Sequence, residues 1–174
     1  LKNGGANYAY LGNTAGSNVS VLKACKNAGV DVQFLGNVWG MDENAAKAAG
    51  SAADGVVIPV RTRALWNENA PGMKIAREIG GGDNYRPLHY LAGICTAFYV
   101  KESMEWAAGH GGITATKIRD GMYAKKDWVP KGLEGLCAPS TWAATDHRPT
   151  TEIILYRTKV SGATDAPLGD LMKA

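Results

Sequence analysis

The sequence predicts an α/β fold: a parallel sheet in a three-layer arrangement, with helices on both faces. Short apolar segments alternate with helical ones at a repeat of about twenty residues, which is typical of parallel βαβ units. The first two apolar segments each end in a loop of glycine, asparagine and a hydroxyl or aromatic residue. The carboxyl ends of parallel strands meet at one edge of a sheet, where folds of this class bind ligands.

The first repeat of this pattern contains two strands and one helix. We expect strands at Asn7–Leu11 and Val30–Leu35. Between them, the Gly-Ser-Asn segment 16–18 supplies turn and cap chemistry for a helix whose apolar residues recur on one face. Gly29 is placed to end that helix in the left-handed conformation.

The next repeat leads to a third strand and a long connection. Asp42 is a suitable cap for a short alanine-rich helix through Ala49. A strand is expected at Gly55–Val60, and Pro59 places its end near an edge of the sheet. The polar segment Arg61–Gly72 indicates a long crossing loop.

Three helices and a strand are expected in the second half of the chain. A brief helix runs from Pro71 to Ile79, and the glycine-rich segment 80–83 after it marks a hinge or domain crossing. The longest helix, Tyr85–Ala108, is apolar almost all round in its middle, so it must be covered on more than one side. A helix at Ile113–Lys126 ends in two lysines that suit its dipole. A strand at Thr151–Val160 is followed by a polar, frayed tail from Gly162.

Composition and charge exclude several classes of function. The chain has 174 residues, 45% hydrophobic and 20% charged, which is typical of a globular domain. Its net charge of +3 is spread along the chain, and the longest basic run is Lys125-Lys126, so we expect no nucleic-acid partner. The most apolar run, Leu91–Val100, is about half the ~20 residues of a membrane span. The first residue is Leu1, so we expect a fragment or a processed product.

No recognisable catalytic, metal or phosphate site stands in the sequence. The histidines His89, His110 and His147 lie in no known catalytic motif, and neither a G-x-S-x-G elbow nor a P-loop lysine is present. The Asp-His-Arg segment 146–148 offers too few ligands for a metal and indicates a turn. We therefore expect a protein that is not an enzyme and needs no cofactor and no metal.

The three cysteines show no metal-binding spacing. Cys25, Cys95 and Cys137 are odd in number and form no C-x-x-C pair, and spacing alone cannot show a disulfide. Cys25 and Cys95 lie on apolar helix faces, which favours small buried hydrophobic residues.

The two loops at the strand ends contain the candidate ligand-binding residues. Asn13, Thr14 and Asn37 offer amide and hydroxyl groups, and Trp39 offers a flat apolar wall. Such a combination is typical of small-molecule sites. The alternative is that these are only turn residues, since Asn, Gly and Thr are common turn formers.

The chain resembles the second half of a solute-binding receptor. The matching text, in family order, is YAYLGNTAGSN, KNAGVDVQFLGNVWGMDE, AAGSAADGVVIPV, HYLAGICTAFYVKESME, ITATKIRDGM and GLCAPSTWAATDHRPTTEIILYRTK. Together these segments resemble the branched-chain amino acid receptor group of ABC transporters, which has the type I periplasmic binding fold. The resemblance covers nearly all of residues 1–160.

The resemblance implies the ligand-binding subunit of an ABC importer, and it names residues for this function. The ligand would be a small carboxylic acid, a branched-chain or aromatic amino acid or an aromatic acid, bound in a cleft between two lobes. In the family, the loop after the first strand contributes a ligand contact, here at about Thr14. The loop after the second strand contributes a group for the ligand's ammonium, often a glutamate, and here the segment 37–39 holds no acid. An unpaired buried charge is costly, which argues against a plain amino acid. The family's aromatic contact matches Tyr90, so with Trp39 it favours an aromatic or other apolar carboxylic acid. Trp66 is a weaker candidate at the rim of the cleft.

The resemblance also implies partners and a location. The ligand-binding lobes would be periplasmic or extracytoplasmic, with a signal peptide in the precursor, and would deliver the ligand to a membrane permease. This chain would lack the first lobe and the opening strand and helix of the second. The implied segments are a second-lobe α/β domain, helices that return to the first lobe, and closing strands with a tail: 1–80, 81–135 and 136–174. The alternative is a ligand-sensing domain of a receptor or regulator with the same fold.

Overall fold

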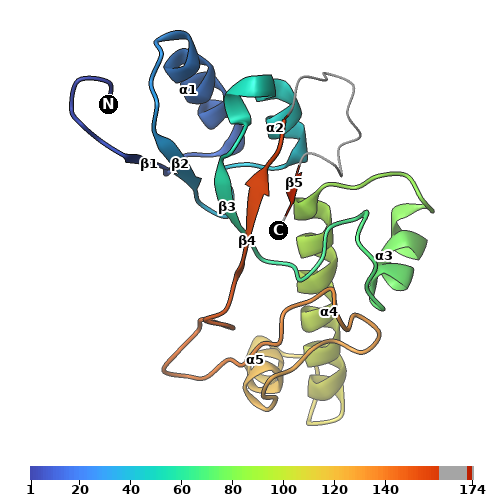
Figure 1. Cartoon of the computed structure of the whole chain (residues 1–174). Helices are drawn as coiled ribbons and strands as arrows, with labels where there is room; N and C mark the ends of the chain where they lie inside the picture. The colour runs from blue at the N-terminus through green and yellow to red at the C-terminus, as the bar shows by residue number, and fades with distance from the viewer. Residues whose placement is uncertain (161–171, 174) are drawn as a thin grey trace. The chain divides into compact units, whose positions relative to one another are not determined.

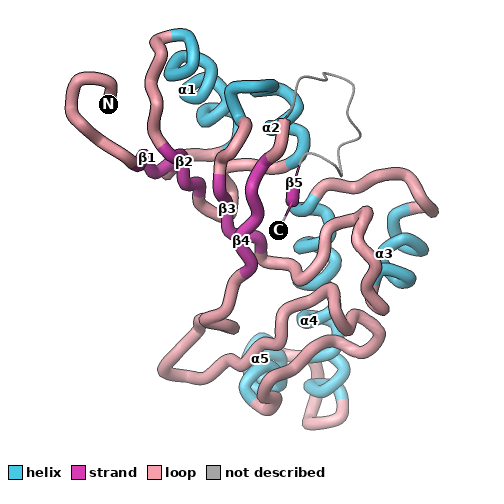
Figure 2. Tube along the Cα trace, in the orientation of Figure 1, coloured by secondary structure: helices cyan, strands magenta, loops and turns pink. Residues whose placement is uncertain are grey.

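The computed structural model describes residues 1–160 and 172–173, and the chain divides into two compact units (Figures 1 and 2). Unit 1 comprises Leu1–Val60 together with the chain from Ile154, and unit 2 comprises Arg61–Ile153. The three segments expected from the sequence have other bounds and stay a prediction: 1–80, 81–135 and 136–174.

Unit 1 is built on a sheet that confirms the predicted α/β class. Among the described residues it has five strands, in the spatial order β1 (Tyr8–Leu11), β2 (Gln33–Gly36), β3 (Val57–Val60), β4 (Ile154–Thr158) and β5 (Met172–Lys173). The first three strands pair in parallel, whereas β4 and β5 run antiparallel to their neighbours (Figure 1). The tail expected to be frayed from Gly162 lies outside the described residues, apart from β5.

Pro59 lies in an interior strand rather than near an edge of the sheet. β3 has neighbours on both sides, but its pairing with β2 is limited to the register pair Leu35 and Val57. Pro59 lies beyond that pair, so its missing N–H interrupts no ladder with β2. The short parallel pairing therefore accommodates the proline.

The sheet has one buried and one exposed face, because side chains alternate along each strand. Leu11 and Ile58 lie on the buried face, where a Cβ at Gly36 would come within 2.9 Å of Ile58 Cγ2. On the opposite face Tyr10 is 68% exposed and Leu155 is 59% exposed. The described part of unit 1 therefore leaves apolar groups uncovered on one side.

The N-caps of the first two helices are only partly as expected. α1 (Ala15–Asn27) begins earlier than the segment 16–18 suggests, because Thr14 has extended backbone angles and forms the N-cap. α2 (Glu43–Ala49) begins as predicted, with Asp42 accepting a hydrogen bond of 2.7 Å from the backbone N–H three residues on.

The end of α1 explains why β2 starts late. Gly29 has φ of +64°, as the sequence predicts for a helix end. The N–H of Val30 donates to the carbonyl of Cys25 at 2.9 Å, so the chain is still completing the cap where a strand was expected. Pairing with β1 begins only at Gln33. A short 3-10 turn, η1 (Gly50–Ala53), follows α2.

Unit 2 contains three α-helices among its residues 61–153: α3 (Met73–Gly80), α4 (Leu88–Ala108) and α5 (Ala115–Tyr123). The expected start of α4 at Tyr85 is wrong. Pro87, with ψ of 166°, is the N-cap, and the residue before a proline is itself disfavoured in the helical conformation. The helix therefore begins after the proline rather than before it.

Glu102 joins α4 to the chain that follows α5. Its carboxylate accepts hydrogen bonds from Lys125 Nζ at 3.0 Å, Trp128 Nε1 at 2.7 Å and the backbone N–H of Lys131 at 2.6 Å. The sequence suggested that Lys125 lies in the last turn of α5. Since α5 ends at Tyr123, Lys125 lies beyond it. Lys125 Nζ instead lies 3.8 Å from the centroid of the Trp128 ring.

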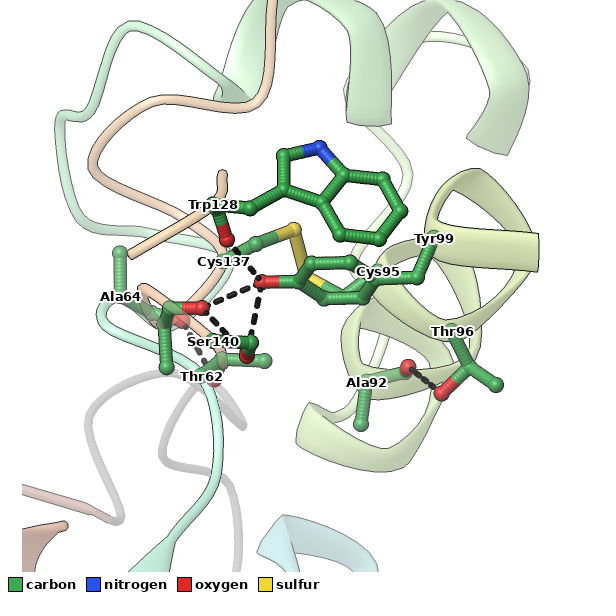
Figure 3. Close-up of a disulfide and its surroundings, with 10 residues drawn as sticks. Thr62, Ala64, Ala92, Cys95, Thr96, Tyr99, Trp128, Cys137 and Ser140 are labelled. Carbon is green, nitrogen blue, oxygen red and sulfur yellow. Dashed lines mark hydrogen bonds between the residues drawn. A yellow bond between two sulfur atoms is a disulfide. The ribbon is translucent and has the colours of Figure 1, made fainter. Parts of the chain in front are cut away.

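A disulfide between Cys95 and Cys137 forms a second tie to α4 (Figure 3). Cys95 is buried, as the apolar helix face predicts, but it is also bonded to a partner 42 residues further along. Cys25 is a free, half-buried thiol. Because the residues after α5 form few regular elements, cross-links of this kind hold them in place.

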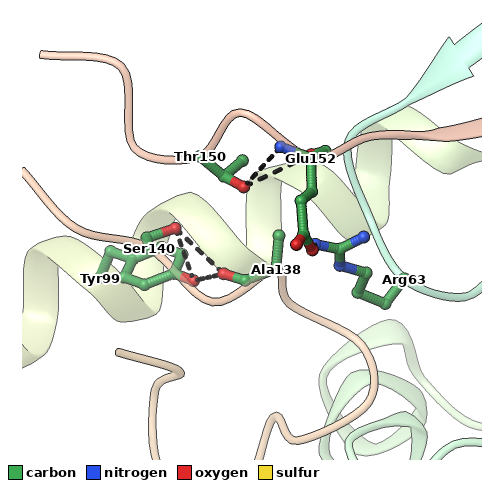
Figure 4. Close-up of polar contacts among 6 residues, drawn as sticks. All are labelled: Arg63, Tyr99, Ala138, Ser140, Thr150 and Glu152. Atoms are coloured by element: carbon green, nitrogen blue, oxygen red, sulfur yellow. Dashed lines mark hydrogen bonds and ion pairs between the residues drawn. The ribbon is translucent and has the colours of Figure 1, made fainter. Parts of the chain in front are cut away.

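Tyr99 lies beside the disulfide and completes this core. Its ring meets those of Trp128 and Trp142 edge-on, at centroid distances of 4.9 and 5.1 Å. Its hydroxyl donates to the carbonyl of Ala138, and Ser140 Oγ donates to the Tyr99 oxygen at 3.2 Å (Figure 4). Burial raises the pKa of Tyr99, so this hydroxyl stays protonated and remains a donor.

We expect removal of the disulfide to destabilise unit 2. In the chain-entropy model, a cross-link that spans 42 residues contributes about 4 kcal/mol. The double variant Cys95→Ala/Cys137→Ala should lower the free energy of unfolding by an amount of that order, measured by urea denaturation. Cys25→Ala is the matched control and should change it little. Equal stability of the double variant and the wild type would contradict this assignment.

We expect Glu102 to make unit 2 sensitive to acid. Burial would raise the pKa of Glu102, but the hydrogen bonds from Lys131, Lys125 and Trp128 outweigh burial and hold the pKa below its usual value of 4.5. A carboxylate with a lowered folded-state pKa contributes stability above the unfolded-state pKa and loses it as the pH falls through the folded-state value.

Glu102→Gln tests this contribution. The variant should unfold at lower urea concentration than the wild type at pH 7, by about 1–3 kcal/mol. The difference between the two proteins should shrink as the pH falls below 4.5 and through the lowered folded-state pKa, where the wild-type carboxylate also becomes neutral. A difference that stays constant from pH 7 to pH 3 would show that the charge of Glu102 contributes nothing.

Candidate functional site

The loops after β1 and β2 lie side by side in unit 1. The two strands are parallel, and their last residues, Leu11 and Gly36, are register partners. The loops that follow therefore leave the sheet at the same edge, as the sequence predicts. The structure thus brings four of the five candidate residues together, Asn13, Thr14, Asn37 and Trp39, and places the fifth, Tyr90, in unit 2.

The side chain of Asn37 joins the two loops. Its Nδ2 donates to the carbonyls of Leu11 and Asn13, both at 3.2 Å. Its Oδ1 accepts from the backbone N–H of Trp39 at 2.7 Å. Both ends of the Asn37 amide are therefore engaged in holding the loops, so this residue positions the candidate site rather than presenting free polar groups.

Asn13 and Thr14 have different roles. The side chain of Asn13 stabilises the turn, whereas that of Thr14 is exposed. Asn13 Oδ1 accepts from the backbone N–H of Thr14 at 3.0 Å, which shapes the turn before α1. Thr14 is exposed and makes no side-chain capping bond, so its hydroxyl points to no helix N–H. Trp39 is 53% exposed. Thr14 and Trp39 are the candidate residues whose side chains this loop pair offers to solvent.

The loop pair carries no carboxylate at the position where the resemblance implies one for an ammonium. Asp42 is the first acidic residue after Trp39, and its side chain is engaged as the N-cap of α2. Glu43, which follows, is fully buried. Both acidic residues that follow this loop are therefore part of the folded scaffold: Asp42 as a helix cap and Glu43 in the interior.

Asn18 is a further residue of the loop pair. It lies in α1, four residues before Leu22 on the same face, and it is 1% exposed. Its Nδ2 donates to the carbonyls of Asn13 and Gly40, each at 2.9 Å, so one buried amide spans both loops. The signal in the sequence is a polar residue at a core position of an amphipathic helix, whereas its place after Gly16 and Ser17 suggested a cap.

Tyr90 lies in the first turn of α4 in unit 2. Tyr90 is 36% exposed, and its hydroxyl donates to the carbonyl of Ile79 at 3.4 Å. The ring of Trp66 meets it edge-on at a centroid distance of 6.3 Å. Trp66 itself is 3% exposed, so it supports Tyr90 from behind and does not present its own face as a cleft rim would require.

Unit 2 also contains a small cavity of about 200 Å³ beside the disulfide. Tyr99 and Trp142 are among the residues that line it. The nearby hydroxyls are bonded within the protein: Thr150 Oγ1, for example, accepts from the N–H of Glu152 at 3.1 Å (Figure 4). Glu152 in turn pairs with Arg63 at 3.1 Å. A ligand in this cavity would therefore be bound mainly by contact with its wall, because the nearby hydroxyls are already hydrogen-bonded.

The described residues contain no metal-binding cluster and no helix suited to span a membrane. No group of three His, Cys, Asp or Glu side chains in residues 1–160 could hold a metal ion. None of the helices in that part of the chain is long and apolar enough to cross a membrane.

We expect the Asn18 amide to hold the two loops together. Asn18→Ala would leave the buried Gly40 carbonyl without this donor and the Asn13 carbonyl with Asn37 as its remaining side-chain donor. It should lower the free energy of unfolding by about 1–3 kcal/mol. It should also shift the backbone amide NMR resonances of both loops. Ser20→Ala, an exposed change on the same helix, is the control. Unchanged resonances in the second loop would contradict the role of Asn18.

Solved structures with the same fold include proteins of about twice this length. A branched-chain amino acid ABC transporter protein from Thermus thermophilus with bound valine has a TM-score of 0.73 and 20% identity, and the match covers 89% of this chain and 43% of that one. A substrate-binding periplasmic protein from Ralstonia solanacearum has a TM-score of 0.73 and 19% identity, over 95% and 44% of the chains. A solute-binding protein from R. palustris in complex with benzoate has a TM-score of 0.63 and 16% identity, over 90% and 40%.

These likenesses show the fold, and the chain spans less than half the length of each of these proteins. A comparison with curated proteins found no match. A family model described as periplasmic binding protein matches residues 1–164, which is nearly the whole chain. The chain therefore belongs to the periplasmic binding protein family.

Proposed function

We propose that this chain is part of an extracytoplasmic ligand-binding subunit of an ABC importer, which binds a small carboxylic acid in a cleft between two lobes. The observation that carries the proposal is the cross-linked loop pair of unit 1, fixed by Asn18 and Asn37 at the sheet edge where α/β folds bind ligands. Membership of the periplasmic binding protein family supports the same function. The function is binding and delivery, without catalysis.

The ligand class follows from the groups that the candidate residues offer. Thr14 provides a hydroxyl, while Trp39 and Tyr90 provide aromatic surface. No carboxylate of the loop pair is free for an ammonium, since Asp42 caps α2. These groups favour an aromatic acid over a plain branched-chain amino acid. One solved relative of the same fold was crystallised with benzoate and another with valine.

The disulfide supports the proposed location of the receptor, and the length of proteins with the same fold supports a further lobe. The bond between Cys95 and Cys137 is typical of proteins that fold in an oxidising compartment, which supports a periplasmic or extracytoplasmic site. The relatives of the same fold have more than twice the length matched here, which supports a further lobe in the natural polypeptide. A membrane permease would receive the ligand from the closed receptor.

A thermal-shift screen tests this proposal. The natural polypeptide that carries these 174 residues would be heated with valine, leucine, phenylalanine or benzoate. A ligand at a hundred times its Kd stabilises the folded state by about 2.7 kcal/mol, so at least one compound should raise the Tm clearly, with benzoate ahead of valine. Stabilisation by none of them would overturn the proposal.

The aromatic residues provide a second arm of that screen. Trp39→Ala and Tyr90→Ala should each weaken binding of the best compound by about tenfold, because each removes an aromatic contact. Tyr8→Ala is the control, since Tyr8 is an exposed aromatic residue at the start of β1, the end of the strand opposite the loops. An equal loss of affinity in all three variants would show that the site lies elsewhere.

A further inference from the structure

The C-terminal end of α3 is bound by two side chains from further along the chain, Arg86 and Tyr90. Arg86 donates from Nη2 and Nε to the carbonyl of Gly80, at 2.8 and 3.3 Å. Tyr90 donates to the carbonyl of the preceding residue, Ile79. The last carbonyls of a helix have no partner within the helix, so these two side chains satisfy them. Arg86 and Tyr90 are thereby fixed next to each other.

The two groups form one surface. The guanidinium carbon of Arg86 lies 5.4 Å from the centroid of the Tyr90 ring, within the range of a cation–π contact. Behind the ring, Trp66 closes the cluster, and a Cβ at Gly80 would lie only 2.5 Å from the Trp66 ring. A glycine is therefore required for this close approach. A surface held in this way loses little conformational freedom when it binds a ligand.

Arg86 keeps its positive charge available on this surface. Of the ion pairs formed among residues 1–160, none includes Arg86. A guanidinium has five N–H donors in a planar fork, and the Gly80 carbonyl uses two of them. The remaining donors have the geometry that carboxylates prefer, since arginine binds carboxylates through paired, charge-assisted hydrogen bonds.

We infer that Arg86 recognises the carboxylate of the ligand, while Tyr90 contacts its apolar part. This inference rests on the proposed function and concerns the same site. The ligand is an anion with a flat or apolar body, and a residue of unit 2 binds its carboxylate. It assigns the anion contact to a residue of this chain.

Titration calorimetry with paired probes tests the inference on the natural polypeptide. Each probe acid is compared with its carboxamide, in which a neutral amide replaces the carboxylate: benzoate with benzamide, phenylalanine with phenylalaninamide, and valine with valinamide. The wild type should prefer the acid of the pair that it binds. Arg86→Gln should weaken binding of that acid by about tenfold to a hundredfold and leave the amide unchanged, because only the acid makes charge-assisted bonds. Arg86→Lys, which keeps the charge without the fork, should fall between.

Arg119→Gln is the matched control, because Arg119 also stacks on a tyrosine of unit 2, with 5.8 Å between its guanidinium carbon and the ring centroid of Tyr123. It should bind every probe as the wild type does. An Arg86→Gln variant that loses acid and amide equally, or loses neither, would overturn the inference and leave the receptor function standing. A wild type that prefers an amide would do the same. If no probe of any pair binds, the proposed function and the inference fall together.

Discussion

A single buried amide, that of Asn18, satisfies a carbonyl from each of the two loops at the edge of the sheet. Parallel strands that end at the same edge bring two irregular segments close together, and these segments contain backbone groups that no ladder can satisfy. Asn18 supplies two N–H donors from the neighbouring helix, one for Asn13 and one for Gly40. The position of Trp39 depends on this bond and on Asn37, because both bonds set the path of the loop that carries it.

Unit 2 meets a different constraint, since much of its chain after α5 is irregular. That part of the chain is held by three residues of one helix, α4. Cys95 forms a covalent bond to it, Tyr99 contacts it through its ring and hydroxyl, and the carboxylate of Glu102 accepts hydrogen bonds from three donors in it. These residues are spaced by three or four positions along the helix, so they share one face. The apolar face of α4 is thus also the face that orders the segment beyond α5.

The order of strands and helices could be predicted because it depends on local patterns: apolar segments, the Asp42 cap and the glycine at position 29 all act within a few residues. The placement of the loops followed from parallel pairing. The bond between Cys95 and Cys137 could not be predicted, because it joins residues 42 positions apart and nothing in the spacing marks them as partners. The role of Asn18 was hidden for the same reason, since its acceptors lie in separate loops. The start of α4 was misjudged where Pro87 outweighed the helical pattern around it.

The amide of Asn37 is occupied on both sides by the backbone of its own loops. In the proposed receptor, support and recognition are therefore assigned to different side chains of the same short segment. Substitutions at Thr14 or Trp39 can alter what the loop pair offers to a ligand without breaking the bonds that hold it. A receptor built in this way can acquire a new ligand by changes at exposed positions, while the asparagines beneath them keep the scaffold constant.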